Sequence, residues 1–308
     1  MNNLTIIMYH YVRPISISKF PNIKGLELER FKNQLDYLVE NYNVITTQHV
    51  IDACNKNLKL PKNACWLTFD DGYKDHSLYV FPELLKRNLH GAFFPPRIAI
   101  EKEVTLDVNS IQYIISCAND ISELVTKLNE MCKSYNISDK QLNLYYKKYG
   151  IKNRFDNTST IYFKRMLQHV LPEEIRNTII SELFKHYVGI SEKVFSNNLY
   201  MNVSELKQLV SNGMYVGSHG SMHYWLDRIS PEKQRIDIQD SLTFLEHIGS
   251  STNSWVMCYP YGAYNNDTLS ILKRLGASVG ITTEAREADI SKDNKYTLPR
   301  LDTNDFPQ

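Results

Sequence analysis

The stretch Trp66-Leu67-Thr68-Phe69-Asp70-Asp71-Gly72-Tyr73 runs from an apolar segment directly into two adjacent carboxylates and a glycine. An apolar run of this kind predicts a buried strand, with the aspartates at its carboxyl end. Two ionised carboxylates side by side repel each other unless a cation, a shared proton or solvent separates them. A solvated turn and a metal site both fit this stretch when it is read alone, so other parts of the chain are needed to choose between them.

Strand and helix patterns alternate on both sides of this stretch. Short apolar runs at 4–9 and 91–94 predict buried strands, and apolar residues at helical spacing at 31–42 predict a helix between them. The alternation resumes after residue 200, with strands predicted at 214–216, 255–258, 278–281 and 297–301. Such alternation is typical of parallel α/β folds, whose sites form at the carboxyl ends of strands. His10 and Asp70 should therefore lie on the same rim.

The composition changes between about residues 104 and 200. Asn, Lys, Ser and Tyr are frequent there, glycine is scarce, and the segments 121–131 and 173–184 have helical spacing. We therefore expect a helical insertion at 104–200 that separates a first part of the α/β fold at 1–103 from a second part at 201–308. The Tyr-Lys cluster at 145–149 could contact a carbohydrate or a phosphate, although a solvated helix face explains it better.

The bulk composition excludes several classes of protein. The 308 residues include 35 basic and 34 acidic ones, so no overall charge favours nucleic acid or an anionic membrane surface. The five cysteines are widely spaced without a C-x-x-C pair, which argues against a disulfide framework and a cysteine-based zinc site. No segment reaches the about 18 to 20 apolar residues of a membrane span, and the first residues lack a basic leader. We therefore expect a soluble, cytoplasmic protein with no nucleic-acid partner.

His219 and His223 are four residues apart. On one helical turn both imidazoles would face the same side and could share a metal ion. Exposed histidine pairs with this spacing are common, and without a glutamate at position 220 the pair is not the H-E-x-x-H motif of metalloproteases. One aspartate with two histidines is nevertheless an open ligand set for a catalytic divalent ion. Together with Asp71, the pair predicts a metal site.

With these residues the chain resembles the polysaccharide deacetylases, the NodB-homology superfamily that is also called carbohydrate esterase family four. The segment Thr68-Phe69-Asp70-Asp71-Gly72 matches its first motif, Ser218-His219-Gly220-Ser221-Met222-His223 its second, and Tyr259-Pro260-Tyr261-Gly262 its third. The resemblance covers about residues 1–105 and 200–308. It implies a distorted (β/α) barrel of the NodB-homology type, interrupted by the helical insertion.

The resemblance also implies a role for each matching residue. Asp71, His219 and His223 would bind a divalent ion, with zinc expected first and cobalt or nickel as alternatives. Asp70 would be the general base, and the backbone N–H of Tyr261 would help the ion to stabilise the tetrahedral oxyanion. The implied reaction is hydrolysis of the N-acetyl group of an amino sugar, in a polysaccharide or in its nucleotide- or lipid-linked precursor.

Two departures from the family pattern concern the base and the acid. Cys258 stands where the family often has an arginine that orients the base, and no histidine follows His247 to protonate the leaving amine. The Tyr9-His10 opening is similar to that of the poly-N-acetylglucosamine deacetylases, whose rearranged motif order puts this histidine first. His10 is therefore the candidate general acid, and a histidine that only packs or supports the site is the alternative.

Weaker candidates and other functions remain. Arg300 and Asp302 would either orient the base or the acid or form an ordinary ion pair, and Tyr259 and Pro260 of the third motif could contact substrate. A deformylase of a lipid-linked amino sugar is a close variant of the implied function. A sugar-binding or scaffolding protein that kept the fold and lost the chemistry is the alternative from another class.

Overall fold

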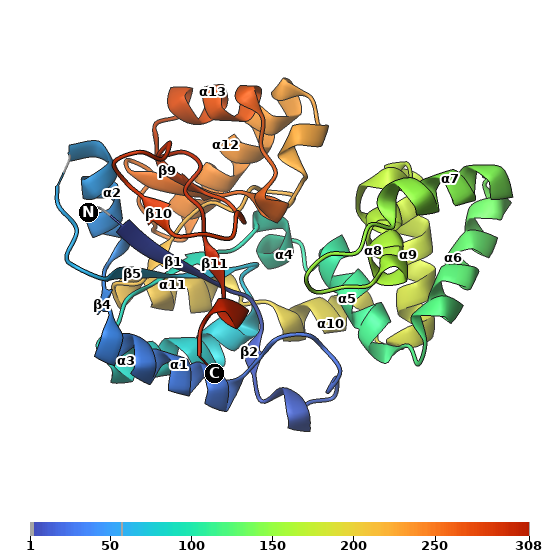
Figure 1. The fold of residues 1–308 in the computed structure, drawn as a ribbon, viewed down its shortest axis with the longest axis horizontal. Coiled ribbons are helices and arrows are strands. Elements are labelled where there is room, and N and C mark those ends of the chain that lie inside the picture. Colours follow the sequence, from blue (N-terminus) through green and yellow to red (C-terminus); the bar gives the residue numbers. More distant parts are fainter. Residues whose placement is uncertain (1–2, 57, 308) are drawn as a thin grey trace. The chain divides into compact units, whose positions relative to one another are not determined.

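The computed structural model describes residues 3–56 and 58–307. The chain folds into two compact units, and Figure 1 shows the elements of each. The larger unit combines Met1–Ile15, Gly25–Val104 and Ser196–Gln308, and the smaller one combines Ser16–Lys24 and Thr105–Phe195. The predicted domain boundaries near residues 104 and 200 stay a prediction.

The larger unit is built on mostly parallel strands. Its strands are β1 (Asn3–Tyr9), β2 (Val12–Arg13), β3 (Leu26–Glu27), β4 (Asn43–Val44), β5 (Ala64–Asp70), β6 (Gly91–Phe94), β7 (Tyr215–Val216), β8 (Trp255–Cys258), β9 (Ala277–Ile281), β10 (Ala288–Asp289) and β11 (Leu301–Asp302). β1 pairs with β5 on one side and with β10 and β11 on the other, and β5 leads on to β6 and β7. Only β10 runs antiparallel among these partners.

Single bridges join this sheet to the separate pair of β8 and β9. Ser218, just after β7, bridges to Met257 of β8, and Ile281 at the end of β9 bridges to Leu298, which shortly precedes β11. The strands therefore follow one another in a ring from β1 through β5, β6, β7, β8 and β9 back to β11. Two links of this ring are isolated bridges instead of full ladders. This arrangement confirms the expected α/β fold of a distorted barrel.

Helices cover the strands of the larger unit. They are α1 (Leu28–Asn41), α2 (Thr47–Lys56), α3 (Phe81–Lys86), α4 (Arg97–Glu101), α11 (Val203–Ser211), α12 (Pro231–His247) and α13 (Asn266–Arg274). Figure 1 shows α12 and α13 on one side of the strands and α1 and α3 on the other. β5 is buried along its whole length between these layers, as its continuous apolar run predicted. Because β1, β5 and β6 are parallel, their carboxyl ends meet at one rim.

The smaller unit is helical, as the composition of the insertion predicted. Its helices are α5 (Asp107–Cys117), α6 (Ile121–Ser134), α7 (Asp139–Tyr149), α8 (Thr158–Arg165) and α9 (Glu173–Tyr187), and α10 (Glu192–Leu199) begins in this unit and ends in the larger one. Leu124, Tyr162 and Leu183 are buried in this unit. Lys147 and Lys148 of the Tyr-Lys cluster are exposed on α7, as a solvated helix face requires. No helix of residues 3–56 and 58–307 combines the length and apolarity needed to cross a membrane.

Short helical turns complete the chain and correct parts of the sequence prediction. They are η1 (Ile15–Ile17), η2 (His76–Val80), η3 (Met166–Val170), η4 (Leu226–Arg228), η5 (Pro260–Gly262) and η6 (Thr303–Asp305), of which η2 and η3 are π-helical. The last strand is shorter than predicted, because β11 contains only Leu301 and Asp302. His219 and His223 do not share a helical turn. Their segment is a loop, since Gly220 and His223 have φ angles of 69° and 57°, which an α-helix does not allow.

Candidate active site

Asp71, His219 and His223 converge although they are far apart in the sequence. Oδ1 of Asp71 lies 3.3 Å from Nε2 of His219 and 3.3 Å from Nε2 of His223. Two ligand atoms that each lie about 2.1 Å from one zinc ion at a tetrahedral angle are about 3.4 Å apart. All three side chains are buried. The geometry and the donor types therefore fit a divalent ion with three protein ligands and an open position.

The carboxyl group of Asp71 is ionised in this setting. Burial by itself raises its pKa, but the close approach of His219 and His223 to Oδ1 outweighs burial and holds the pKa well below its usual range. An anionic oxygen beside two imidazole nitrogens is the charge state that a divalent cation requires of its ligands.

A loop presents the two histidines, and α12 holds this loop from one side. The carboxylate of Asp237 accepts hydrogen bonds from the backbone N–H groups of Ser221, at 3.1 Å to Oδ2, and of Met222, at 2.7 Å to Oδ1. A Cβ atom on Gly220 would lie 2.6 Å from Oδ2 of Asp237, and the φ of this residue is positive, so the contact requires glycine. Asp237 thereby satisfies two backbone donors that a helix would otherwise have satisfied.

The beginning of α4 holds the same loop from another side. Nε of Arg97 donates to Oγ of Ser221 at 2.8 Å, and the backbone N–H of Ile98 donates to the carbonyl of Ser221 at 2.9 Å. Two helices thus fix the residues between His219 and His223. This explains how a segment without helical structure can aim both imidazoles at one carboxylate oxygen.

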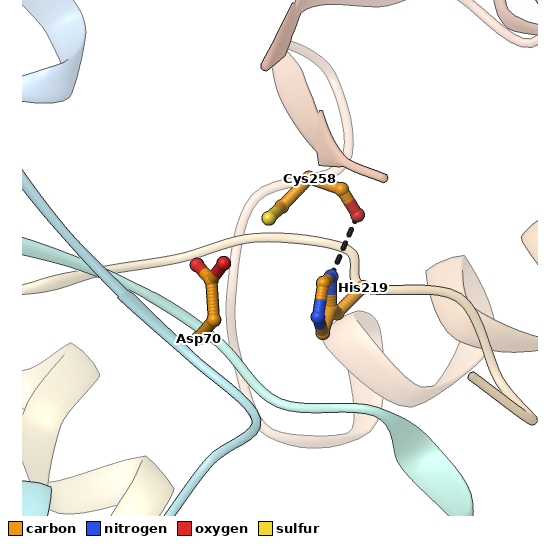
Figure 2. A group of neighbouring side chains, drawn as sticks. All are labelled: Asp70, His219 and Cys258. Atoms are coloured by element: carbon orange, nitrogen blue, oxygen red, sulfur yellow. Dashed lines mark hydrogen bonds between the residues drawn. The ribbon is translucent and has the colours of Figure 1, made fainter. Parts of the chain in front are cut away.

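The backbone of β8 sets the orientation of His219. Nδ1–H of His219 donates to the carbonyl oxygen of Cys258 at 2.7 Å, shown as the dashed line in Figure 2. This bond fixes which nitrogen carries the proton and leaves Nε2 as the ligand atom that faces Asp71.

Asp70, His219 and Cys258 form a second group of ligand-type atoms, which lie within 4.8 Å of one another. Figure 2 shows the sulfur of Cys258 on the side that faces Asp70. This group fits an ion less well, because both oxygens of Asp70 already accept hydrogen bonds from Arg300. The group of Asp71, His219 and His223 is therefore the better candidate for a metal.

Arg300 forms a two-point ion pair with Asp70 in the interior. Its Nη1 and Nη2 donate to Oδ1 and Oδ2 of Asp70 at 2.8 and 2.7 Å, and its Nε donates to the carbonyl of Thr282 at 2.8 Å. The guanidinium is fully buried. The pairing holds the Asp70 carboxylate in one orientation, and a role of Arg300 in orienting the catalytic base stays a prediction.

This pairing determines the charge of Asp70. Burial raises the pKa of the carboxyl group, but the charge and hydrogen bonds of Arg300 lower it to about 2. Asp70 is thus an ionised hydrogen-bond acceptor at neutral pH.

His10 lies beside Asp70 at the rim. Its Nε2 is 4.0 Å from Oδ2 of Asp70, and its side chain is 39% exposed, so solvent and a ligand can reach it. The buried His76 supports this position, since its Nε2–H donates to the carbonyl oxygen of His10 at 2.9 Å. Burial lowers the pKa of His76 to about 4, so this supporting ring is neutral.

Three residues of the predicted site have left-handed backbone conformations. The φ angles of Asp71, His223 and Tyr261 are 67°, 57° and 60°. The other non-glycine residues with this conformation in the described chain are Asn63, Asn88, Asn136 and Glu103. Asparagine, aspartate and histidine adopt it more readily than other residues, whereas it is unfavourable for a bulky side chain. Of these three site residues, Tyr261 is therefore the one with a strained backbone.

The residues of the third motif, 259–262, have different contacts and different roles in the structure. The ring of Tyr261 stacks on Trp225 at 4.4 Å and lies 4.8 Å from the ring of His223. Pro260 is buried. The hydroxyl of the buried Tyr259 donates to the carbonyl of Tyr296 at 2.7 Å, which gives Tyr259 a structural role. Of these residues, Tyr261 has the contacts expected of a site residue.

Asp302 does not join the charged residues of the site. Its carboxylate accepts the backbone N–H of Asn304 at 2.9 Å and caps η6. The ion pair with Asp70 is made by Arg300. Asp302 therefore has a local structural role.

Sequence reasoning missed two residues that contact the candidate metal ligands or their loop. The hydroxyl of Tyr73 donates to Oδ2 of Asp71 at 2.5 Å. Tyr73 lies two residues after Asp71 in the sequence, but no sequence pattern indicated what its hydroxyl would bind. No sequence pattern pointed to Asp237 as a buried residue, because an aspartate in an amphipathic helix is normally exposed.

Comparisons with known proteins bear on the predicted resemblance. Residues 171–280 match the family model described as "Polysaccharide deacetylase". The chain is 26% identical over 110 residues to "Putative polysaccharide deacetylase YxkH" of Bacillus subtilis, a match that spans 35% of this chain and 38% of that relative. The predicted resemblance to the polysaccharide deacetylases is confirmed. The likeness of the Tyr9-His10 opening to the poly-N-acetylglucosamine deacetylases stays a prediction.

Solved structures share the fold over almost the whole chain. The deacetylase PplD of Streptococcus pyogenes, in complex with acetate, aligns with a TM-score of 0.61 and 18% identity over 97% of this chain and 92% of its own. IcaB from Ammonifex degensii aligns with a TM-score of 0.55 and 19% identity over 98% and 91%. At these identities the likeness establishes the fold.

Proposed function

From the resemblance to the polysaccharide deacetylases, we propose that this chain is a divalent-metal-dependent hydrolase that removes the N-acetyl group from an amino sugar. One observation carries the proposal: Oδ1 of Asp71 lies 3.3 Å from Nε2 of both His219 and His223, next to the ionised carboxylate of Asp70. An ion held there would supply Lewis-acid activation of water and of the acetyl carbonyl.

Asp70 is the proposed general base. Its carboxylate stays ionised and is held in one orientation by Arg300, so it can accept a hydrogen bond from the attacking water and then take its proton. A carboxylate with a pKa of about 2 is a weak base, so this proton transfer needs the acidification of water that a bound divalent ion would supply.

His10 is the proposed general acid. Its Nε2 lies 4.0 Å from Oδ2 of Asp70, and its half-exposed ring can face a sugar at the rim. The proton taken from water by Asp70 can pass to His10 and from there to the nitrogen of the leaving amine. This path balances the reaction. The hydroxyl of water bonds to the acetyl carbon, the C–N bond breaks, and the proton of water ends on the amine nitrogen.

Tyr261 is proposed to stabilise the oxyanion through its backbone N–H. The left-handed conformation of Tyr261 and its stacking on Trp225 fix the direction of this peptide group. Removing one such donor typically costs about 3 kcal/mol of transition-state stabilisation.

The proposed substrate is an N-acetylated amino sugar of a polysaccharide or of its nucleotide- or lipid-linked precursor, and zinc is the proposed ion, with cobalt and nickel as alternatives. Two imidazoles and a carboxylate are ligands that all three ions accept. The complete set of ligands, base and acid favours an enzyme over a sugar-binding relative without activity. The expected cytoplasmic location stays a prediction.

The test measures metal content and acetate release with three variants. Wild-type protein loaded with zinc, cobalt or nickel should contain one ion per chain and release acetate from short N-acetylglucosamine oligomers or nucleotide sugars. Asp71→Asn should lose both the ion and the activity. Asp70→Asn and His10→Gln should keep the ion and lower kcat by about 100-fold or more, the scale of general acid–base catalysis.

Three results would contradict parts of this proposal. A wild-type protein that binds none of the three ions at neutral pH excludes the metal-dependent enzyme. Full activity of Asp70→Asn shows that another group is the base. Release of formate instead of acetate from matched N-formyl and N-acetyl substrates would identify a deformylase.

A further inference from the structure

The two oxygens of Asp71 have different partners. Oδ1 faces the imidazoles of His219 and His223 at 3.3 Å each. Oδ2 accepts a hydrogen bond of 2.5 Å from the hydroxyl of Tyr73. A phenol is protonated at neutral pH and must donate when it meets an ionised carboxylate. Only Oδ1 is therefore directed at the space between the histidines.

Tyr73 is fixed from both sides by other rings. Its ring lies 4.1 Å from the ring of Tyr11 at an interplanar angle of 26°, and 6.1 Å from the ring of Tyr200 at 12°. The side chain of Tyr73 has no exposed surface. A ring packed in this way has little freedom to swing its hydroxyl away from Asp71.

The backbone around Tyr73 is fixed as well. Tyr73 forms an antiparallel bridge with Tyr200, and the N–H of Met201 donates to the carbonyl of Gly72 at 3.0 Å. Asp71 and Gly72 both have left-handed φ angles, of 67° and 68°. Donor and acceptor thus stand on a turn that is held by a second segment of the chain.

We propose that Tyr73 is a positioning residue that restricts Asp71 to coordination through the single oxygen Oδ1. The inference rests on the proposed function, because it assumes an ion between Asp71, His219 and His223. A carboxylate that binds through both oxygens fills one more position on the ion and is typical of calcium sites with six to eight ligands. By occupying Oδ2, Tyr73 keeps a position open for water and substrate and favours an ion of low coordination number.

The Tyr73→Phe variant tests this role, with Tyr200→Phe as the matched control that removes a hydroxyl from the same ring stack. The metal-free proteins are titrated with Zn²⁺ and Co²⁺ against a chromogenic chelator, and the visible spectrum of the Co²⁺ form is recorded. For Tyr73→Phe we expect about 10- to 100-fold weaker binding, the usual effect of losing a partner of a metal ligand. Its Co²⁺ absorption should also weaken, because freed Oδ2 raises the coordination number. Tyr200→Phe should match the wild type in both measurements.

A measurement on the wild type keeps the inference testable if Tyr73→Phe folds poorly. X-ray absorption at the zinc edge should show one short bond to a carboxylate oxygen, and a carboxylate bound through both oxygens would overturn the inference. A Co²⁺ spectrum and affinity of Tyr73→Phe equal to those of the wild type would also overturn it. Either result leaves the proposed function standing, whereas a wild type that binds neither ion contradicts both.

Discussion

At the scale of single residues, Asp70 and Arg300 form a buried ion pair in the site. Both side chains are buried, and two parallel hydrogen bonds join them. A buried charge whose partner is removed keeps its desolvation cost without compensation. The pair is therefore expected to matter for folding as well as for the orientation of the base.

Replacing Arg300 by glutamine should destabilise the protein strongly. The free energy of unfolding should fall by about 3–5 kcal/mol at neutral pH, because the carboxylate of Asp70 is left buried and unpaired. Urea unfolding of both proteins measures this difference. Arg286→Gln is the matched control, since Arg286 forms half-exposed ion pairs with Asp293 and Glu284 and should have little effect.

The stability difference between wild type and Arg300→Gln should also depend on pH. The folded wild type holds the pKa of Asp70 at about 2, below the value of about 3.9 in an unfolded chain. Its stabilising contribution is therefore complete above about pH 4 and is lost as the pH falls towards 2. The difference between the two proteins should narrow over this range, and a constant difference would show that Arg300 acts by packing alone.

At the scale of elements, a loop held by a helix positions the two histidines. His219 and His223 lie on a loop whose backbone N–H groups are bound by Asp237 of α12. Each carboxylate oxygen of Asp237 accepts one of these bonds. The position of two candidate metal ligands thus depends on a helix that begins eight residues after His223.

Asp237→Asn should weaken metal binding without removing any ligand. The amide keeps one acceptor oxygen but turns an NH₂ group towards a backbone N–H, so one hydrogen bond is lost and a donor is left unpaired. We expect a loss of about 1–3 kcal/mol in stability and weaker binding of zinc by about 10-fold. Competition with a chelator and thermal unfolding measure the two effects.

Glu232→Gln is the control for this prediction, because Glu232 lies on the same helix and forms an exposed ion pair with Arg235, away from the loop. It should bind zinc like the wild type. Equal zinc affinity of Asp237→Asn and wild type would show that the loop holds its shape without the carboxylate.

At the scale of the whole larger unit, the ring of strands brings distant parts of the chain to one rim. Asp71 follows β5, the two histidines follow β7, and Arg300 precedes β11. Two links of the ring are single bridges, at Ser218 and at Leu298. An ion bound by Asp71, His219 and His223 would join segments about 150 residues apart in sequence next to one of these links.

Zinc should therefore stabilise the folded chain against heat. At a free zinc concentration 100 times the dissociation constant, the expected stabilisation is about 2.7 kcal/mol, which raises the melting temperature by several degrees. His223→Asn should lose this shift, whereas His186→Asn, which changes an exposed histidine of α9, should keep it. An equal shift in both variants would locate the zinc elsewhere in the chain.

The sequence by itself determined the fold class and the identity of the candidate ligands. The alternation of strands and helices depends on local periodicity, and the three motifs place Asp70, Asp71, His219 and His223 at strand ends. The periodicity is a property of short segments and can be read from their spacing, whereas the motifs and the roles of their residues come from the resemblance to the polysaccharide deacetylases. The helical insertion could be predicted because its helical spacing is likewise a local property of the sequence.

Only the tertiary structure decided the partners of these residues. Arg300 reaches Asp70 because β11 lies beside β1 and β1 beside β5, and no local pattern encodes that neighbourhood. The loop of His219 and His223 keeps its shape through Asp237, a contact between segments that pack only in the folded chain. The same holds for the hydroxyl of Tyr73, because hydrogen bonds of buried groups depend on which segments the fold brings together.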